Sequence, residues 1–294
     1  MAESFPVPTI KSLNDLHKAY RMAREKFKRP PWFRGHWDAS WKLLPSVFRP
    51  DEHGKLLPEE SIANRFKTQA PIRYANCPEG NDYFGWLCLM QHYRLRTRLL
   101  DWSESILVAA FFAVTDESSG RRDAKGQQTK APGAIWALSP NHLFSWRAQK
   151  RDDEHGFPRT PDHPGIVGLA ADAFGVHLRD LNQEYRHGAT IAAIPKEVDL
   201  RMLMQAARFT VHGKAEGALP QALEVQAHAS LYLMKFEIAE GFKGTLRNML
   251  VELGINEHTL FPDLEHLARR IVEDAKVDEI VPEGSGAEGP EQAG

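Results

Sequence analysis

The sequence predicts an α+β fold in which a mixed or antiparallel sheet forms the core and helices flank it. Short apolar runs typical of strands lie between segments with the periodicity of helices. The most apolar segment, residues 101–114, has the composition of a buried central helix. With 294 residues, of which 42% are hydrophobic and 26% charged, the chain is an ordinary globular mixture long enough to bury a large core.

We expect one domain over residues 1–281, with inserted loops near 118–132 and 149–164 and a disordered tail over 282–294. The first loop is polar and basic, the second is charged and rich in proline, and the tail is rich in Gly, Glu and Pro. No internal repeat or strong linker divides the chain. The alternative is two domains that meet near residues 149–164.

Six segments carry helix signals. Ser12 and Asp15 have the spacing of a capping box, and apolar residues recur at helical spacing after them. Residues 101–114 are the strongest helix prediction, and either Asp101 or Ser103 can cap this helix. The other predicted helices begin after Pro58, span residues 81–92 and 242–253, and begin near Pro262, with Leu264, Leu267 and Ile271 as apolar positions of the last one.

Five short apolar runs are predicted as strands, because proline, glycine or polar residues bound them. In residues 231–238, Lys235 and Glu237 share one face and apolar side chains the other, so we expect a half-exposed strand. Residues 93–101 are interpreted as a loop. The other strands are predicted over residues 32–36, 133–139, 189–194 and 209–212.

Charge and residue usage narrow the function classes. The formal net charge is −2 and the isoelectric point is near 6.7, so non-specific nucleic-acid binding is not indicated, although a local basic groove stays possible. Cys77 and Cys88, the only cysteines, have no zinc-ligand spacing and are expected to be reduced packing residues. The 13 histidines are scattered, so no metal is expected.

The sequence also predicts where the protein works. Residues 1–8 lack the apolar core of a signal peptide, and no apolar run is long enough to span a bilayer. A cytoplasmic protein without membrane contact is therefore expected. The sequence has no glycine-rich phosphate loop, no serine nucleophile elbow and no helical zinc motif.

The run Trp32–Trp37 is the first candidate site, because it places Arg34 between aromatic residues and a glycine. Aromatic neighbours can bury the arginine stem, and Gly35 lets a ligand approach the backbone. A guanidinium held in this way suits a phosphate or a carboxylate. Phe33 and His36 are expected to line the same site. The alternative is a structural arginine that pairs with an internal acid such as Asp101.

The second candidate is the polar cluster of residues 89–103. It contains His92, three arginines and Asp101 directly before the predicted buried helix, whose free N–H groups and dipole favour an anion. The alternative is that Asp101 only caps the helix, that Trp102 is a core residue and that the arginines are solvated. The donors expected for a phosphate are Thr97, Arg98 and Ser103.

The third candidate is the segment from Arg201 to Gly213, with Gln205, Arg208, Phe209 and His212. Gln205 is its chief member. Its side chain could bind a ligand amide or a ribose hydroxyl, although a glutamine near the start of a strand is more often structural.

These segments resemble the FRG family, whose name comes from the Phe33-Arg34-Gly35 signature. Residues 89–93, 97–102 and 109–113 are similar to its central block. Two further blocks follow in the expected order, so the resemblance runs from about Trp32 to about Arg270. One departure is Arg94, with Arg96 nearby, where the family usually has a Gly-x-Pro turn. The further blocks are residues 203–211, with Gln205 and Phe209, and residues 253–264.

The aromatic-Arg-Gly strand more distantly resembles the first motif of arginine-type ADP-ribosyltransferases. This resemblance implies an ADP-ribosyltransferase-like fold in which Arg34 holds the diphosphate of NAD, the substrate, without a metal. Residues 97–113 loosely resemble the second motif. The third motif of those enzymes carries a catalytic glutamate, but no acid lies beside Gln205 here. Asp101 or Glu257 could replace it.

The leading hypothesis is an enzyme that transfers ADP-ribose from NAD or hydrolyses NAD. Its catalytic residues would be Arg34, His92, Asp101 and Gln205, with Arg98 and Ser103 also gripping phosphates. Alternatives are a non-catalytic nucleotide-binding module and an effector that acts on nucleic acid. The acceptor of ADP-ribose would be a protein or a nucleic acid. The family resemblance implies a role in a toxin or defence system. The oligomeric state stays open. Rings that could stack on the ligand are those of Phe33, Tyr93 and Trp102.

Overall fold

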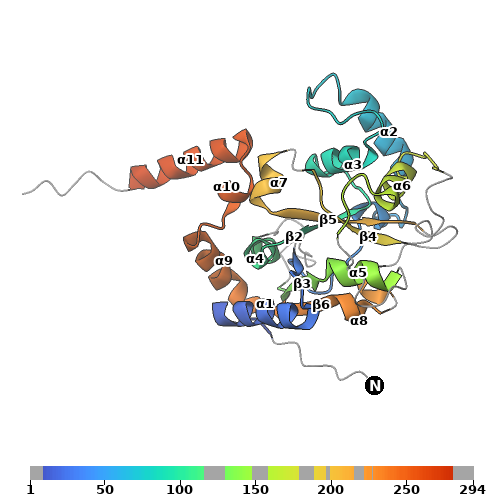
Figure 1. Ribbon diagram of the computed structural model, residues 1–294. Coiled ribbons are helices and arrows are strands. Elements are labelled where there is room, and N and C mark those ends of the chain that lie inside the picture. Colours follow the sequence, from blue (N-terminus) through green and yellow to red (C-terminus); the bar gives the residue numbers. More distant parts are fainter. Residues whose placement is uncertain are drawn as a thin grey trace, which may run out of the picture.

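One six-stranded antiparallel sheet organises the chain, with helices on both of its faces (Figure 1). The computed structural model describes residues 9–115, 130–147, 158–178, 189–196, 199–214, 222–226 and 228–280. The predicted α+β fold class is therefore confirmed. The predicted loop near 149–164 lies partly, and the loop near 118–132 mostly, outside the described residues, and so does the tail over 282–294.

The strand order is β4-β5-β2-β1-β3-β6. The strands are β1 (Trp32–His36), β2 (Leu99–Ser103), β3 (Gly133–Leu138), β4 (Thr190–Ala193), β5 (Ala207–His212) and β6 (Leu233–Ile238). The helices are α1 (Leu13–Phe27), α2 (Glu59–Gln69), α3 (Tyr83–His92), α4 (Ile106–Thr115), α5 (Pro140–Arg147), α6 (Pro164–Asp172), α7 (Leu200–Met204), α8 (Ala229–Tyr232), α9 (Lys243–Glu252), α10 (Glu257–Leu260) and α11 (Leu264–Ile280), with short 3-10 turns η1 (Ser46–Phe48), η4 (Leu223–Val225) and η5 (Glu240–Phe242).

Most predicted elements agree with the structure, and their local causes are visible. The Ser12 side chain accepts a hydrogen bond from the Asp15 backbone N–H at 3.1 Å, and so begins α1. The helix ends where Lys28 takes a left-handed conformation, with φ of 55°. Gly254 follows α9 with φ of 78°, as a C-terminal cap requires. The predicted strands β1, β3, β4, β5 and β6 are all confirmed to within two residues at each end.

The region around Asp101 was predicted wrongly. Residues 99–103 form strand β2 instead of a loop and a helix start, and α4 begins only at Ile106. The cause is non-local, because β2 pairs along its whole length with β5, from Leu99 opposite Val211 to Ser103 opposite Ala207. The cap of α4 is Ser105, whose Oγ accepts from the Val108 backbone N–H at 3.4 Å.

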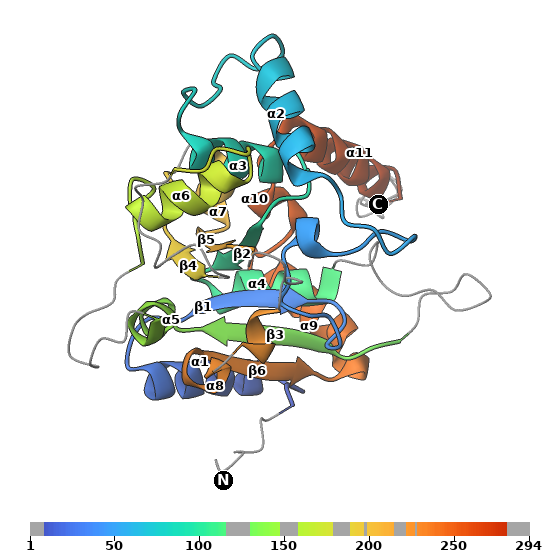
Figure 2. The same ribbon diagram turned by 90° about the vertical axis from the view of Figure 1, so that its right-hand side faces the viewer.

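The sheet divides into two halves that meet at one residue pair. Strand β1 pairs with β3 over five positions, but with β2 only at Phe33 opposite Ser103. The two halves are turned relative to one another, with β1, β3 and β6 running together and β2 crossing at an angle (Figure 2). Helices α2, α3 and α6 pack over the β2–β5–β4 half, whereas α1, α4 and α9 pack over the β1–β3–β6 half.

The contact between α4 and β1 is unusually close and depends on Gly35. A Cβ atom added to Gly35 would collide with the Ala109 carbonyl oxygen and lie 2.7 Å from the Ala113 nitrogen. The glycine therefore admits the backbone of α4. The space that a side chain would take is therefore filled by the helix, and the approach of a ligand to the Gly35 backbone stays a prediction.

Each outer edge strand of the sheet carries one isolated bridge. Ile10 bridges the β6 edge, donating its N–H to the Glu237 carbonyl at 2.7 Å and accepting from the Ala239 N–H at 3.0 Å. Arg159 bridges the β4 edge in the same way through Ala192 and Ile194, both at 2.9 Å.

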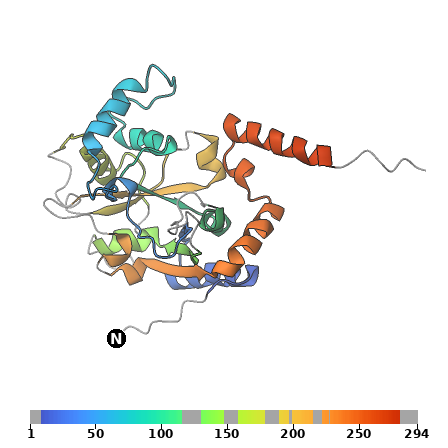
Figure 3. The same ribbon diagram turned by 180° about the vertical axis from the view of Figure 1, so that it is seen from behind.

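Helix α11 extends away from the rest of the molecule (Figure 3). The apolar positions expected on it are largely exposed, at 82% for Leu264, 50% for Leu267 and 58% for Ile271. Within the described parts of the chain, no helix has both the length and the hydropathy needed to cross a membrane.

We expect Gly35→Ala to lower the free energy of unfolding by about 1–3 kcal/mol or more, because the new methyl group must push α4 away from β1. Urea unfolding followed by circular dichroism would measure the change. Gly244→Ala in α9 is the matched control, since nothing lies within 4 Å of its added Cβ. Equal stability of wild type and Gly35→Ala would refute the close-packing explanation.

Candidate ligand-binding cavity

A cavity of about 660 Å³ opens where β1 and β2 separate. This volume falls within the range of about 300–1,000 Å³ that is usual for small-molecule sites. Its walls come from α3, α4, α7 and the ends of β1, β2 and β5, so residues far apart in the sequence meet there. The predicted site residues that line it are Phe33, Arg34, Gly35, His92, Asp101, Trp102, Ser103 and Gln205.

Arg34 reaches across the gap between the two halves of the sheet. Its Nη1 donates to the Asp101 carbonyl oxygen at 2.6 Å and lies 3.5 Å from Asp101 Oδ2. Its Nε donates to His36 Nε2 at 3.1 Å. Among the described residues, Nη2 has no hydrogen-bond partner. The structure therefore contains the Arg34–Asp101 pair, and one amine of Arg34 is left for another group.

His36 supports Arg34 instead of lining the cavity. Burial, followed by the positive charges of Arg34 and Arg49, holds the pKa of His36 well below its ordinary value. The imidazole is therefore neutral at pH 7 and can accept the hydrogen bond from Arg34 Nε. Its buried position makes His36 a residue that orients Arg34.

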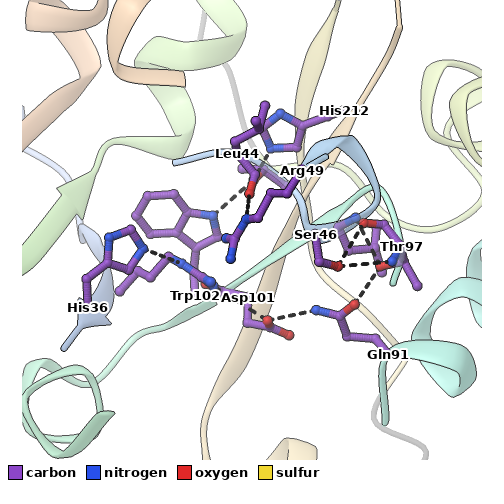
Figure 4. A network of polar contacts seen from close by, with 12 residues as sticks. His36, Leu44, Ser46, Arg49, Gln91, Thr97, Asp101, Trp102 and His212 are labelled. Carbon is purple, nitrogen blue, oxygen red and sulfur yellow. Dashed lines mark hydrogen bonds and ion pairs between the residues drawn. The ribbon is translucent and has the colours of Figure 1, made fainter. Parts of the chain in front are cut away.

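A chain of side-chain hydrogen bonds fixes the Asp101 carboxylate (Figure 4). Gln91 Nε2 donates to Asp101 Oδ2 at 2.8 Å, and Gln91 Oε1 accepts from the Thr97 hydroxyl. The Thr97 backbone N–H donates in turn to the Ser46 hydroxyl at 3.2 Å. Thr97 is fully buried and outside the cavity, so it acts through Gln91 instead of contacting a ligand. Sequence reasoning did not select Gln91, although it lies in the central block.

His92 and Asp199 form a second polar pair in the cavity. His92 Nδ1 lies 3.1 Å from Asp199 Oδ2, and Asp199 also caps α7 by accepting from the Met202 N–H at 2.8 Å. Burial by itself raises the pKa of Asp199, but the hydrogen bonds from His92 and Met202 outweigh it and lower the pKa overall. Asp199 was missed because only the fold brings α7 beside α3.

Arg98 lies outside the cavity, and its guanidinium is fully engaged by groups of the protein itself. Its Nε and Nη2 donate to the two Glu59 carboxylate oxygens at 2.9 and 2.7 Å, and its Nη1 donates to the Leu169 carbonyl at 2.7 Å. The side chain is 5% exposed. Arg98 therefore joins β2 to α2 and α6, and the expectation that it grips the same phosphate as Arg34 is not supported.

The aromatic residues expected to stack on a ligand are placed less favourably than the sequence suggested. Phe33 is 0% exposed and Trp102 is 3% exposed, so both rings are packed in the core. Trp102 also donates its Nε1 to the Thr210 hydroxyl at 3.0 Å. Tyr93 is half exposed, packs against Phe66 and Tyr74, and does not line the cavity.

Ser103 and Gln205 line the cavity and are held by hydrogen bonds to each other and to nearby backbone groups. Ser103 Oγ donates to the Gln205 carbonyl at 2.7 Å and accepts from the Ser105 N–H at 3.0 Å. The predicted helix start at Ser103 is wrong, because Ser103 lies in β2, and its role as a donor to an anion stays a prediction. Gln205 Nε2 donates to the Leu260 carbonyl at 3.0 Å.

Of the two acids that could replace the missing glutamate, only Asp101 lines the cavity. Glu257 lies elsewhere, 2.6 Å from Arg269 Nη1 and 3.3 Å from His266 Nε2. Cys88 also lines the cavity, but burial raises the pKa of its thiol well above the ordinary value. Over the described residues, no group of three or more His, Cys, Asp or Glu side chains could hold a metal.

Arg94, the departure from the family pattern, has φ of 61°. This left-handed conformation favours glycine, so the chain keeps a glycine-like turn there with a residue that pays a steric cost.

The fold and the cavity together define an α+β protein with a paired arginine and aspartate at the centre of a divided sheet. The model of the FRG domain matches residues 29–122, and this part of the chain is an FRG domain. The match includes β1, α2, α3, β2 and α4, and hence Arg34, His92 and Asp101. Neither the curated proteins nor the solved structures contain a match to the chain.

We expect Arg98→Met to lower the free energy of unfolding by about 3–5 kcal/mol, because it leaves Glu59 as a nearly buried charge without its partner. Chemical denaturation would measure the loss. The double variant Arg98→Met/Glu59→Leu should recover most of it. A stable single variant with impaired ligand binding would instead favour a direct role in the site.

His36 should make stability depend on pH. Because its folded pKa lies below the ordinary 6.5, the unfolded chain binds more protons once the pH falls below 6.5, and stability then decreases. The slope approaches about 1.4 kcal/mol per pH unit for one group. His36→Gln keeps an acceptor for Arg34 and should flatten this part of the profile. Parallel profiles for the two proteins between about pH 5 and 7 would contradict the assignment.

Proposed function

We propose that the cavity binds NAD and that the protein is an ADP-ribosyltransferase-like enzyme, which transfers ADP-ribose or hydrolyses NAD. The observation that carries this proposal is the convergence of three distant segments on one cavity. Arg34 comes from β1, Asp101 and Ser103 come from the strand before α4, and Gln205 comes from the turn before β5. These are the segments that resemble the three motifs of such enzymes.

Arg34 would hold the diphosphate. Its unpaired Nη2 and its position beside the cavity suit a charge-assisted hydrogen bond to a phosphate oxygen. The neutral His36 keeps Nε occupied and fixes the plane of the guanidinium. Arg34 therefore presents a prepared donor, with little side-chain freedom left to lose on binding.

Asp101 would serve the reaction. When the bond between the ribose C1′ and nicotinamide breaks, nicotinamide leaves with the electron pair and positive charge develops on the sugar. A carboxylate held by Gln91 can stabilise that charge electrostatically. Water or an acceptor hydroxyl then forms the new bond to C1′, and its proton passes to Asp101 or to His92. The Asp199 contact with Nδ1 leaves Nε2 of His92 as the acceptor.

One observation favours a non-catalytic nucleotide-binding module as the second candidate. Asp101 is already engaged by Arg34 and Gln91, and no acid follows Gln205 in β5. In that case the same cavity and the same arginine would bind the nucleotide without turnover. A protein or nucleic-acid acceptor and a toxin or defence role stay predictions of the resemblance.

The test is calorimetric titration of NAD into wild type, Arg34→Ala and Asp101→Asn, with nicotinamide release measured on the same samples. Arg34→Ala should weaken binding by about tenfold or more, because a charge-assisted hydrogen bond is lost. Asp101→Asn should keep binding but slow release by about 100-fold or more.

Arg270→Ala, which changes the same charge on the exposed helix α11, is the control and should behave as wild type. Binding without release in wild type would favour the binding module. No binding of NAD at millimolar concentration would refute the proposal.

A further inference from the structure

Arg201, the first residue of the third candidate segment, received no role in the sequence analysis, and it lines the same cavity from α7. Within the described part of the chain, its guanidinium makes no hydrogen bond and no ion pair. It lies 4.6 Å from the centre of the Phe261 ring, over the ring face. Burial lowers the pKa of Arg201, and the carboxylates of Asp101, Asp199 and Asp263 offset only part of this effect. The group is therefore a partly buried cation without an anionic partner.

Phe261 is held so that it can position Arg201. The Phe261 ring stacks on His266, with centroids 4.8 Å apart and planes 16° from parallel, and Phe112 meets it edge-on at 6.1 Å. His266 in turn contacts Asp263 at 2.7 Å. The segment between α10 and α11 thus fixes a cation–π platform beside the cavity. Phe261 belongs to residues 253–264, the last block of the family resemblance, and its contact with Arg201 gives that block a structural role.

The acids of the cavity do not supply the missing partner. Asp101 is bound by Arg34 and Gln91, and Asp199 by His92 and the Met202 N–H. Asp82 accepts from the Gly85 N–H at 2.9 Å as the cap of α3. Glu79 is exposed at the rim.

We propose that Arg201 forms a second anion-binding subsite in the cavity, separate from Arg34, and that it takes a phosphoryl group of the ligand. An exposed lysine, Lys196, also lines the cavity and adds positive charge to it. Arg34 is already engaged by Asp101, so Arg201 is the cation with more unused donors. The ligand class is then a compound with at least two phosphoryl groups, such as a nucleoside diphosphate derivative. That the ligand is a nucleotide rests on the proposed function, whereas the anion subsite rests on the surroundings of Arg201 alone.

The chemistry of Arg201 favours phosphate. A guanidinium offers a planar fork of N–H donors that matches two oxygens of one anion, and its weak hydration suits a partly buried position. A buried cation without a counter-ion is costly, so an anion that enters the cavity is stabilised by the site it completes. A carboxylate also presents two oxygens to a guanidinium, so the experiment must distinguish binding of a phosphate from binding of a carboxylate.

The probe is inorganic pyrophosphate, titrated calorimetrically into the full chain, with malonate as the carboxylate arm. Wild type should bind pyrophosphate more tightly than malonate. Arg201→Gln should weaken pyrophosphate binding by about tenfold or more, and Arg201→Lys should recover only part of it, since the fork is lost. Arg270→Gln is the charge-matched control and should leave binding unchanged.

Phe261 provides an independent check if Arg201→Gln folds poorly. Phe261→Leu removes the ring face and should weaken pyrophosphate binding. Phe261→Tyr keeps a ring and should bind pyrophosphate as wild type does. Pyrophosphate affinity that is equal in wild type and Arg201→Gln, or malonate that binds more tightly than pyrophosphate, would overturn the inference. Binding of pyrophosphate that needs Arg201 in a protein that neither binds nor cleaves NAD would keep the subsite and refute the proposed function.

Discussion

The fold depends on how closely α4 lies against β1. Gly35 has no side chain to separate the two backbones, so the Ala-rich helix rests directly on the strand. Directly before this helix, β2 meets β1 at a single pair, Phe33 opposite Ser103, and then turns away toward β5. The cavity occupies the space where the strands separate. The glycine of the signature therefore serves the architecture, and the arginine next to it serves the opening that this architecture creates.

The strands and helices with local signals could be predicted from the sequence. Two prolines directly precede β1, Ser12 begins α1, and alternation in residues 233–238 defines β6. Strand β2 could not be predicted, since no glycine or proline separates Asp101 from the apolar helix. Its partners in β5 lie far along the chain, and pairing with them overrides the local helical preference.

The candidate site was predicted in part. Arg34 and Asp101 were both selected, and their pairing was the stated alternative. Arg98 is an arginine like Arg34 and lies only three residues before Asp101 in the sequence. Its side chain nevertheless lies outside the cavity and contacts Glu59. Arg201 opens the third candidate segment, but nothing in the sequence singles it out there. Asp199 left no signal, because α7 is a short helix whose position beside α3 and α10 comes only from tertiary packing.

The bridges on the two edge strands bear on how copies of the chain can meet. Open edge strands offer rows of unpaired N–H and C=O groups that recruit a further strand. Here Ile10 and Arg159 occupy backbone groups on β6 and β4 with a single bridge each. Growth of the sheet from one molecule into the next would have to displace these bridges first. At these two positions, the backbone groups of β6 and β4 are therefore not free to pair with a strand from another molecule.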